Sequence, residues 1–190
     1  MDVSDLKGLF AEVKKRMEAQ IDHVRRELGG VRTGRASVTM LDTVHVEAYG
    51  SMMPLNQVAS LSIPEPTLLL ASPFDPTLMG AVEKAIRTSS LGLNPTNDGK
   101  VVRIPIPSLT EERRKELSRI VHKHAEEGRN AVRLVRREAN DKLKKMLKDH
   151  AISEDDERRS LDDVQRLTDQ HIATIDDLQK KKDAELLQKG

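Results

Sequence analysis

Three stretches of the chain place an apolar residue at every third or fourth position, which is the spacing of an amphipathic helix. The first ends at Gly29–Gly30, where we expect a glycine cap because glycine tolerates the left-handed backbone of many helix ends. The second covers residues 110–148, and the third begins at Ser153, whose following acids suit the positive end of a helix. The apolar positions of the first and third stretches are Leu6, Phe10, Val13, Met17, Ile21, Val24 and Leu28, and Leu161, Val164, Ile172, Ile175 and Leu178.

The helical spacing mostly disappears between residues 31 and 107, where all eight prolines occur. Alternating or β-rich runs bounded by turn residues predict short strands here. The predicted strands lie at 44–50, 58–63, 67–71 and 101–106. Pro64-Glu65-Pro66 predicts the turn between the second and third, because proline cannot donate to a strand ladder. Pro76 opens a predicted helix.

A helix with one apolar face needs a partner to cover it, and the partners of the first helix lie beyond the middle segment. We therefore predict an α+β protein with a long three-helix bundle and an inserted small α/β domain of β/α/β type. The bundle is expected to be discontinuous, formed by residues 1–30 and 106–190, with residues 31–105 inserted and hinged to it. The chain crosses between the two parts at Gly29–Gly34 and at Ile104–Pro107, and glycine on one crossing with proline on the other suggests a hinge. A rigid junction is the alternative reading.

The composition narrows the classes of function. A third of the residues are charged and only 2% are aromatic, which leaves little for stacking single-stranded bases. Cysteine is absent, which excludes disulfides and thiolate chemistry. No apolar run is long enough for a membrane span and the acidic N-terminus is no secretory signal, so we expect a cytosolic chain. His122 and His124 point about 200° apart on a helix and cannot share a metal. We expect no enzyme activity, no metal and no cofactor.

A net charge of +1 hides an uneven distribution. Residues 108–150 contain 13 lysines and arginines against 8 acids, and residues 151–190 contain 7 against 11. Two interpretations stay open. The basic and acidic helices attract each other within the bundle, or the basic helix faces a polyanion.

The basic helix carries a row of arginines. At about 100° per residue, Arg133 lies about 40° from Arg129, and Arg136 about 20° on the other side. Arg137 borders this ridge. The planar guanidinium matches the geometry of phosphate, so such a row can follow a nucleic-acid backbone.

An ordinary solvated face is the alternative, in which Glu126, Glu138 and Asp141 neutralise their neighbours. A second basic feature, Arg32 and Arg35, flanks a glycine at the domain junction. These two arginines could hold phosphate or fix the junction by bonding carbonyls, and spacing does not choose between the two.

Longer strings give a more specific signal than periodicity. They occur in order as Arg32-Thr33-Gly34-Arg35-Ala36-Ser37, Tyr49-Gly50, Pro54-Leu55, Glu83-Lys84-Ala85-Ile86, Leu91-Gly92-Leu93-Asn94-Pro95, Leu109-Thr110-Glu111-Glu112-Arg113-Arg114-Lys115, Ala131-Val132-Arg133, Arg136-Arg137, Ile152-Ser153-Glu154-Asp155-Asp156 and Gln165-Arg166-Leu167-Thr168-Asp169. In this order and at these separations, the series resembles the bacterial ribosome recycling factor family along essentially the whole chain.

The resemblance implies a near-L-shaped monomer with dimensions similar to transfer RNA. Members of the family bind the post-termination ribosome, where the bundle contacts large-subunit ribosomal RNA at the intersubunit face. Elongation factor G with GTP then drives separation of the subunits. The GTPase activity belongs to elongation factor G, so the resemblance implies that this chain helps to separate the subunits mechanically and is not a catalyst.

Some residues carry over individually. Arg133 matches the bundle arginine that the family uses against RNA, whereas Arg129 and Arg136 join it by geometry alone. Arg32 and Arg35 match the arginine pair of the family string. The resemblance also places the hinge, because Gly30, Val31, Pro105, Ile106 and Pro107 fall where the family hinges. Leu134 departs from the common asparagine, and Thr67 from a frequent arginine.

A coiled-coil adaptor or chaperone-like structural protein is the competing interpretation. It predicts self-association through the helical stripes, whereas a closed bundle buries them.

Overall fold

The computed structural model describes residues 5–187. The chain divides into two compact units, of which one joins the residues up to Arg32 with Glu112–Leu187. The other unit spans Thr33–Glu111. The first contains the long helices and the second contains every strand of the described residues. The predicted α+β class is confirmed.

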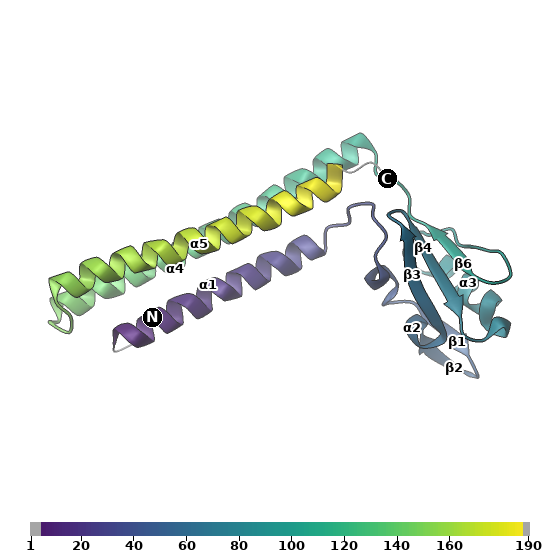
Figure 1. Cartoon of the computed structure of the whole chain (residues 1–190), viewed down its shortest axis with the longest axis horizontal. Helices are drawn as coiled ribbons and strands as arrows, with labels where there is room; N and C mark the ends of the chain where they lie inside the picture. The colour runs from purple at the N-terminus through teal and green to yellow at the C-terminus, as the bar shows by residue number, and fades with distance from the viewer. Residues whose placement is uncertain (1–4, 188–190) are drawn as a thin grey trace. The chain divides into compact units, whose positions relative to one another are not determined.

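The first unit is a bundle of three helices, which run side by side in Figure 1. They are α1 (Leu6–Gly29), α4 (Glu111–Lys148) and α5 (Glu154–Leu187). Asp5 begins α1 by accepting a 2.6 Å hydrogen bond from the Gly8 backbone. Ser153 and Asp156 bond reciprocally at the start of α5, where the Ser153 hydroxyl accepts from the Asp156 N–H at 3.1 Å. All three predicted helices are confirmed.

The end of α1 differs from the prediction. Gly30 caps the helix with φ −74° and ψ −15°, and its N–H donates to the carbonyls of Arg26 and Leu28. The expected left-handed cap is therefore wrong, because the chain leaves the helix through a tightened last turn that any residue can adopt. The left-handed glycine lies further on, at Gly34, with φ +77°.

The bundle core is a continuous strip of apolar side chains from all three helices. Its buried members include Leu9, Val13, Met17, Ile21, Val24, Leu28, Leu117, Val121, Ala125, Val132, Val135, Ala139, Leu143, Met146, Val164, Ile175 and Leu186. Gly128 of α4 lies close to both of the other helices. A Cβ there would overlap the Val24 side chain of α1 and lie 3.3 Å from Ile175 Cδ1 of α5.

The second unit contains two small antiparallel sheets. Strands β1 (His45–Ala48) and β2 (Ser51–Pro54) form a hairpin with Ala48 opposite Ser51. Tyr49 and Gly50 connect them with φ values of 53° and 81°, the two positive values that a type I′ hairpin turn has. The other sheet has the order β3-β4-β6-β5. Its strands are β3 (Ala59–Glu65), β4 (Leu68–Pro73), β5 (Thr96–Asn97) and β6 (Val102–Pro105).

One predicted turn is wrong. Pro64 lies inside β3, not in the loop, and the β3–β4 pairing shifts register after Ser62 and resumes at Glu65 opposite Leu68. Such an irregularity accommodates the missing N–H of proline. The connection to β4 is therefore only Pro66 and Thr67.

Short helices complete the second unit. They are η1 (Val38–Leu41), α2 (Leu55–Val58), η2 (Pro76–Leu78) and α3 (Met79–Thr88). The helix predicted at Pro76 is thus confirmed, with Asp75 accepting from the Thr77 N–H at 2.9 Å at its start. Val82 and Ile86 of α3 are completely buried against the sheet residues, in a core that also holds Leu69 and Ile104. The unit therefore has a core of its own.

No helix among residues 5–187 combines the length and apolarity that crossing a bilayer needs.

Candidate nucleic-acid interface

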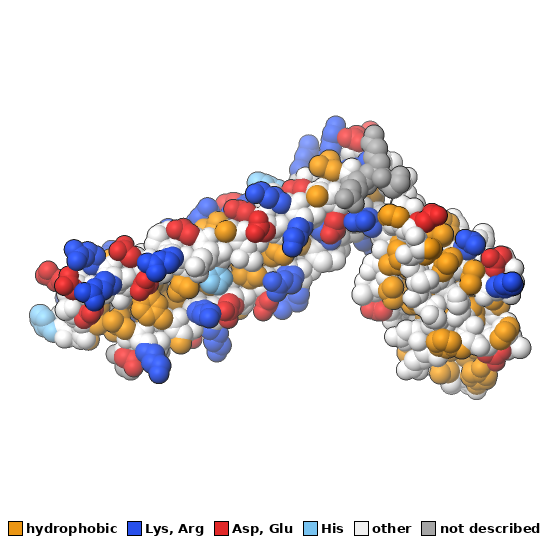
Figure 2. Space-filling model, in the orientation of Figure 1, with side chains coloured by type: hydrophobic (Ala, Val, Ile, Leu, Met, Phe, Trp, Pro, Cys, Tyr) orange, Lys and Arg blue, Asp and Glu red, His pale blue; other side chains and the backbone are white. Residues whose placement is uncertain are grey.

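The basic helix α4 buries one face in the bundle and leaves the other to solvent. Among its arginines, Arg133 has 41% of its side chain exposed, and Arg137 is also exposed. Arg136 is half-buried and donates from Nη1 to Gln165 Oε1 of α5 at 3.1 Å. On the face of the bundle in Figure 2, positive and negative side chains alternate, with no broad area of one sign. This face of the bundle therefore shows no continuous basic patch.

Arg129 does not share the exposed ridge that helical geometry predicts. Only 9% of the residue is exposed, and its guanidinium points along the α4–α5 interface. Nε donates to Glu126 at 2.8 Å, and Nη1 donates to Asp176 at 2.7 Å and to Gln179 at 3.1 Å. Burial works against the charge of Arg129, but its bonds to the two carboxylates outweigh this and raise its pKa. Arg129 is an interhelical anchor in this structure.

Glu126 links the buried arginine to the exposed one. Its Oε2 accepts from Arg129, and its Oε1 accepts from Arg133 Nη1 at 3.3 Å. Arg133 Nη1 also donates to Asn130 Oδ1 at 3.1 Å. The side-chain hydrogen bond from Arg129 is the main cause that lowers the pKa of Glu126, so this carboxyl is ionised at neutral pH. The acid that the sequence suggested as a neutralising neighbour therefore pairs with both arginines.

The acid Glu138, also considered a neutralising neighbour, pairs away from the arginine row. It accepts from both terminal nitrogens of Arg16 on α1, one of them at 3.3 Å. Leu134, which lies beside Arg133 in the sequence, is 46% exposed. The position that departs from the family pattern is therefore on the solvent side of α4.

Arg32 and Arg35 belong to different units, on either side of the boundary between Arg32 and Thr33. Both side chains are exposed, and neither forms a hydrogen bond or ion pair with residues 5–187. Gly34 between them has a positive φ, and a Cβ there would lie 3.1 Å from Leu109 Cγ. Glycine suits this position for two reasons, because it adopts the positive φ and leaves room for the Leu109 side chain.

The residues predicted to hinge are held in different ways. Val31 is buried, and its N–H donates to the Leu28 carbonyl at 3.1 Å. Pro105 ends β6 opposite Leu68. Ile106 continues the sheet through a 2.8 Å bond from its N–H to the Thr67 carbonyl, and its side chain joins the core of the small unit. Pro107, which follows, is exposed. The hinge at these residues stays a prediction.

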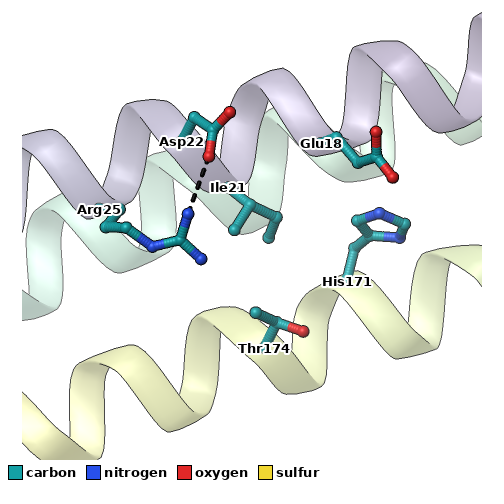
Figure 3. Close-up of a pocket in the computed structure, with 6 residues that line it drawn as sticks. All are labelled: Glu18, Ile21, Asp22, Arg25, His171 and Thr174. Atoms are coloured by element: carbon teal, nitrogen blue, oxygen red, sulfur yellow. Dashed lines mark hydrogen bonds and ion pairs between the residues drawn. The ribbon is translucent and has the colours of Figure 1, made fainter.

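A groove of about 340 Å³ lies between α1 and α5, and Figure 3 shows the side chains that line it. Its polar groups have partners on their own helices. Asp22 accepts from Arg25 at 2.8 Å, and His171 Nδ1 lies 2.7 Å from the Leu167 carbonyl. Glu18 pairs with Lys14 at 3.9 Å. Within residues 5–187, no three histidines, cysteines or acids come together in a way that could hold a metal ion.

Sequence reasoning missed Asp176 and Gln179, the α5 partners of Arg129. Their spacing on α5 is that of ordinary solvent-facing polar residues, and only the packing of α4 against α5 brings them to the guanidinium. The excess of acid on α5 opposite an excess of base on α4 was the available signal.

Known proteins resemble this chain over nearly its whole length. A family model described as ribosome recycling factor matches residues 24–187. The ribosome-recycling factor of Methylobacterium sp. (strain 4-46) is 52% identical over 179 residues, which cover 94% of this chain and 96% of that protein. That of Shouchella clausii (strain KSM-K16) is 52% identical over 182 residues, or 96% and 98% of the two chains.

Solved structures agree. A solution structure of the ribosome recycling factor matches with a TM-score of 0.72 and 40% identity, covering 97% of this chain and 98% of that one. A second match, with a TM-score of 0.63 and 47% identity over 96% and 99% of the chains, is the T. thermophilus ribosome recycling factor. It comes from models of that factor and the E. coli elongation factor G bound to the E. coli post-termination complex. This chain belongs to the ribosome recycling factor family.

Proposed function

We propose that this chain binds the post-termination ribosome in the bacterial cytoplasm and, with elongation factor G and GTP, splits it into subunits. The observation that carries the proposal is the extent of the likeness, because the family match runs through both compact units. The T. thermophilus relative was placed with elongation factor G on a post-termination complex. Members of this family are translation factors and not enzymes. In this proposal the chain binds the ribosome and helps to separate its subunits, and elongation factor G hydrolyses the GTP.

Exposed and half-buried arginines are the groups with which this protein would bind ribosomal RNA. We assign phosphate contacts to Arg133, Arg136 and Arg137 on α4, and to Arg32 and Arg35 near the unit boundary. Arg129 is withdrawn from this set, since it is buried and its Nε and Nη1 donors are engaged inside the bundle. A guanidinium that reaches a phosphate displaces counterions, so binding of this kind weakens as salt rises.

The two units would have separate roles. In this proposal the bundle holds the factor on the large subunit, and the small domain moves on its hinge when elongation factor G acts. The small domain has its own closed core, as a unit that moves as a rigid body requires.

Light scattering of post-termination ribosomes tests the function directly. The chain, elongation factor G and GTP together should lower the scattering as subunits separate, and omission of any one should abolish the decrease. No decrease with a partner of verified activity would refute the proposal. Sedimentation of the free protein tests the competing adaptor reading, which predicts self-association, whereas a closed bundle predicts a monomer.

The variant Arg133→Ala tests the RNA-binding assignment. Loss of one charged contact to a phosphate should weaken binding to large subunits by about tenfold, with the circular dichroism spectrum and unfolding midpoint close to those of the unmodified protein. Arg103→Ala is the matched control, because Arg103 is an exposed arginine of the small unit that pairs with Asp98. A binding curve for Arg133→Ala that overlays the control would remove Arg133 from the interface.

A further inference from the structure

One carboxylate on α4 is shared by two arginines of different exposure. Glu126 accepts from the buried Arg129 with one oxygen and from the exposed Arg133 with the other. The first bond is 2.8 Å long and the second 3.3 Å, so Glu126 is held more closely by the buried partner. Arg129 is in turn bonded to Asp176 and Gln179 of α5. A chain of side chains thus leads from the α4–α5 interface to the exposed face.

The position of Glu126 is set by the interior of the bundle. A buried guanidinium is costly unless it is paired, and Arg129 is paired through Nε with α4 and through Nη1 with α5. Its donor Nε faces Glu126, while Nη1 faces α5. Because two helices fix the guanidinium, the carboxylate that it binds has little freedom to rotate.

Arg133 is restrained on one nitrogen only. Its Nη1 donates to Glu126 and to Asn130, whereas its Nε and Nη2 groups have no hydrogen-bond partner among residues 5–187. The donors left over are those along one edge of the guanidinium, the arrangement that grips a phosphate with two parallel bonds. Because Nη1 is already held by Glu126 and Asn130, Arg133 would lose less side-chain entropy when its Nε and Nη2 groups bind a phosphate.

A carboxylate beside a phosphate site also repels the phosphate. Arg129 offsets part of this repulsion, because it bonds Glu126 at 2.8 Å whereas Arg133 bonds it at 3.3 Å, although Arg129 also shares its positive charge with Asp176. Without Arg129, the full charge of Glu126 would act on Arg133 alone and would draw its guanidinium away from an incoming anion. The buried arginine therefore influences both the orientation and the effective charge of the exposed one.

We propose that Arg129 and Glu126 are positioning residues that hold the guanidinium of Arg133 in the orientation in which it receives an RNA phosphate. The inference rests on the proposed function, since Arg133 is the group that touches RNA there. Arg129 itself makes no contact with RNA in this scheme. It acts through Glu126.

A double-mutant cycle on binding to large ribosomal subunits tests the inference. Arg129→Met should weaken binding about three- to tenfold when Arg133 is present and should have no further effect in Arg133→Ala. Arg16→Met is the matched control, because Arg16 also bridges two helices through a half-exposed acid, Glu138, but has no link to Arg133. It should leave binding unchanged in either background. An equal loss from Arg129→Met in both backgrounds would overturn the proposal in favour of a purely structural role.

A measurement without ribosomes separates this inference from the proposed function. The Nε–H group of Arg133, followed by NMR relaxation, should be ordered in the unmodified protein and in Arg16→Met but mobile in Arg129→Met and in Glu126→Ala. Equal mobility in all four proteins would refute the positioning role even if ribosome binding is normal. An ordered Arg133 in a protein that does not bind large subunits would refute the proposed function and leave the side-chain network standing.

Discussion

At the scale of a single residue, helical geometry predicts the direction in which Arg129 points but not whether its side chain is buried. The angle between Arg129 and Arg133 on α4 follows from about 100° per residue. Whether an arginine at the edge of the apolar face is buried depends on how widely the neighbouring helix covers that face. Here Asp176 and Gln179 reach over α4 and enclose the guanidinium. Those residues lie about 50 positions further along the chain, so no pattern within α4 predicts them.

Gly128 gives a stability prediction at the same scale. Alanine is the better helix former by about 1 kcal/mol, yet a Cβ here would overlap Val24 and crowd Ile175. Because both neighbours belong to other helices of a packed core, we expect Gly128→Ala to lower the free energy of unfolding by about 1–3 kcal/mol. Urea denaturation followed by circular dichroism measures it.

The control for this substitution is Gly29→Ala. Nothing lies within 4 Å of a Cβ at Gly29, the last residue of α1. That variant should be neutral or stabilise the bundle by up to about 1 kcal/mol. Equal stability changes in the two variants would mean that the three helices do not meet closely at Gly128.

At the scale of elements, the sequence predicted the helices and strands whose residue pattern repeats, and it missed the elements that show no such pattern. The three long helices and the strands around residues 45, 60, 70 and 103 carry several periods of their pattern. The hairpin strand β2 does not alternate between buried and exposed residues, and the single turn α2 and the two-residue β5 contain too few residues for a period to show. Gly30 illustrates a different limit, because glycine signals the end of a helix but does not determine which backbone conformation ends it.

The pair between Arg16 of α1 and Glu138 of α4 makes bundle stability depend on pH. The side-chain hydrogen bond from Arg16 is the main cause that lowers the pKa of Glu138 in the folded protein. A carboxyl whose folded pKa is depressed stabilises the fold above its ordinary unfolded pKa, and this contribution is lost as the pH falls through the folded value. Both side chains are about one third exposed, so solvent screening keeps the effect modest.

Glu138→Gln should therefore have a shallower loss of stability on acidification than the unmodified protein. Urea midpoints at neutral pH and at successive steps below pH 5 measure the two slopes. Arg16→Gln removes the other partner and should flatten the curve in the same way. Parallel curves for all three proteins would show that this ion pair is not linked to folding.

At the scale of the whole molecule, the discontinuous bundle could be predicted from the apolar face of the first helix, which needs partners from elsewhere in the chain. A single amphipathic helix at the start of the chain cannot bury its stripe, and the only comparable helices come after the proline-rich segment. The salt bridge from α1 to α4 and the contacts of Gly128 with α1 and α5 show how that requirement is met. The function needed more than this pattern, because long charged helices serve adaptors and translation factors alike. The ordered strings of residues made that distinction.

If both units contact RNA, the salt dependence of binding should report on each separately. The logarithm of the binding constant for large subunits falls linearly with the logarithm of salt concentration, and the slope counts the phosphates that are neutralised. Removing one arginine that contacts phosphate reduces that slope by about 0.7–0.9. We therefore expect this decrease for Arg133→Ala in the bundle and for Arg35→Ala in the small unit. Arg103→Ala should retain the full slope, since Arg103 is an exposed arginine of the small unit that is not among the residues assigned to phosphate. A full slope for Arg35→Ala beside a reduced one for Arg133→Ala would confine RNA binding to the bundle and leave the small unit for the protein partner.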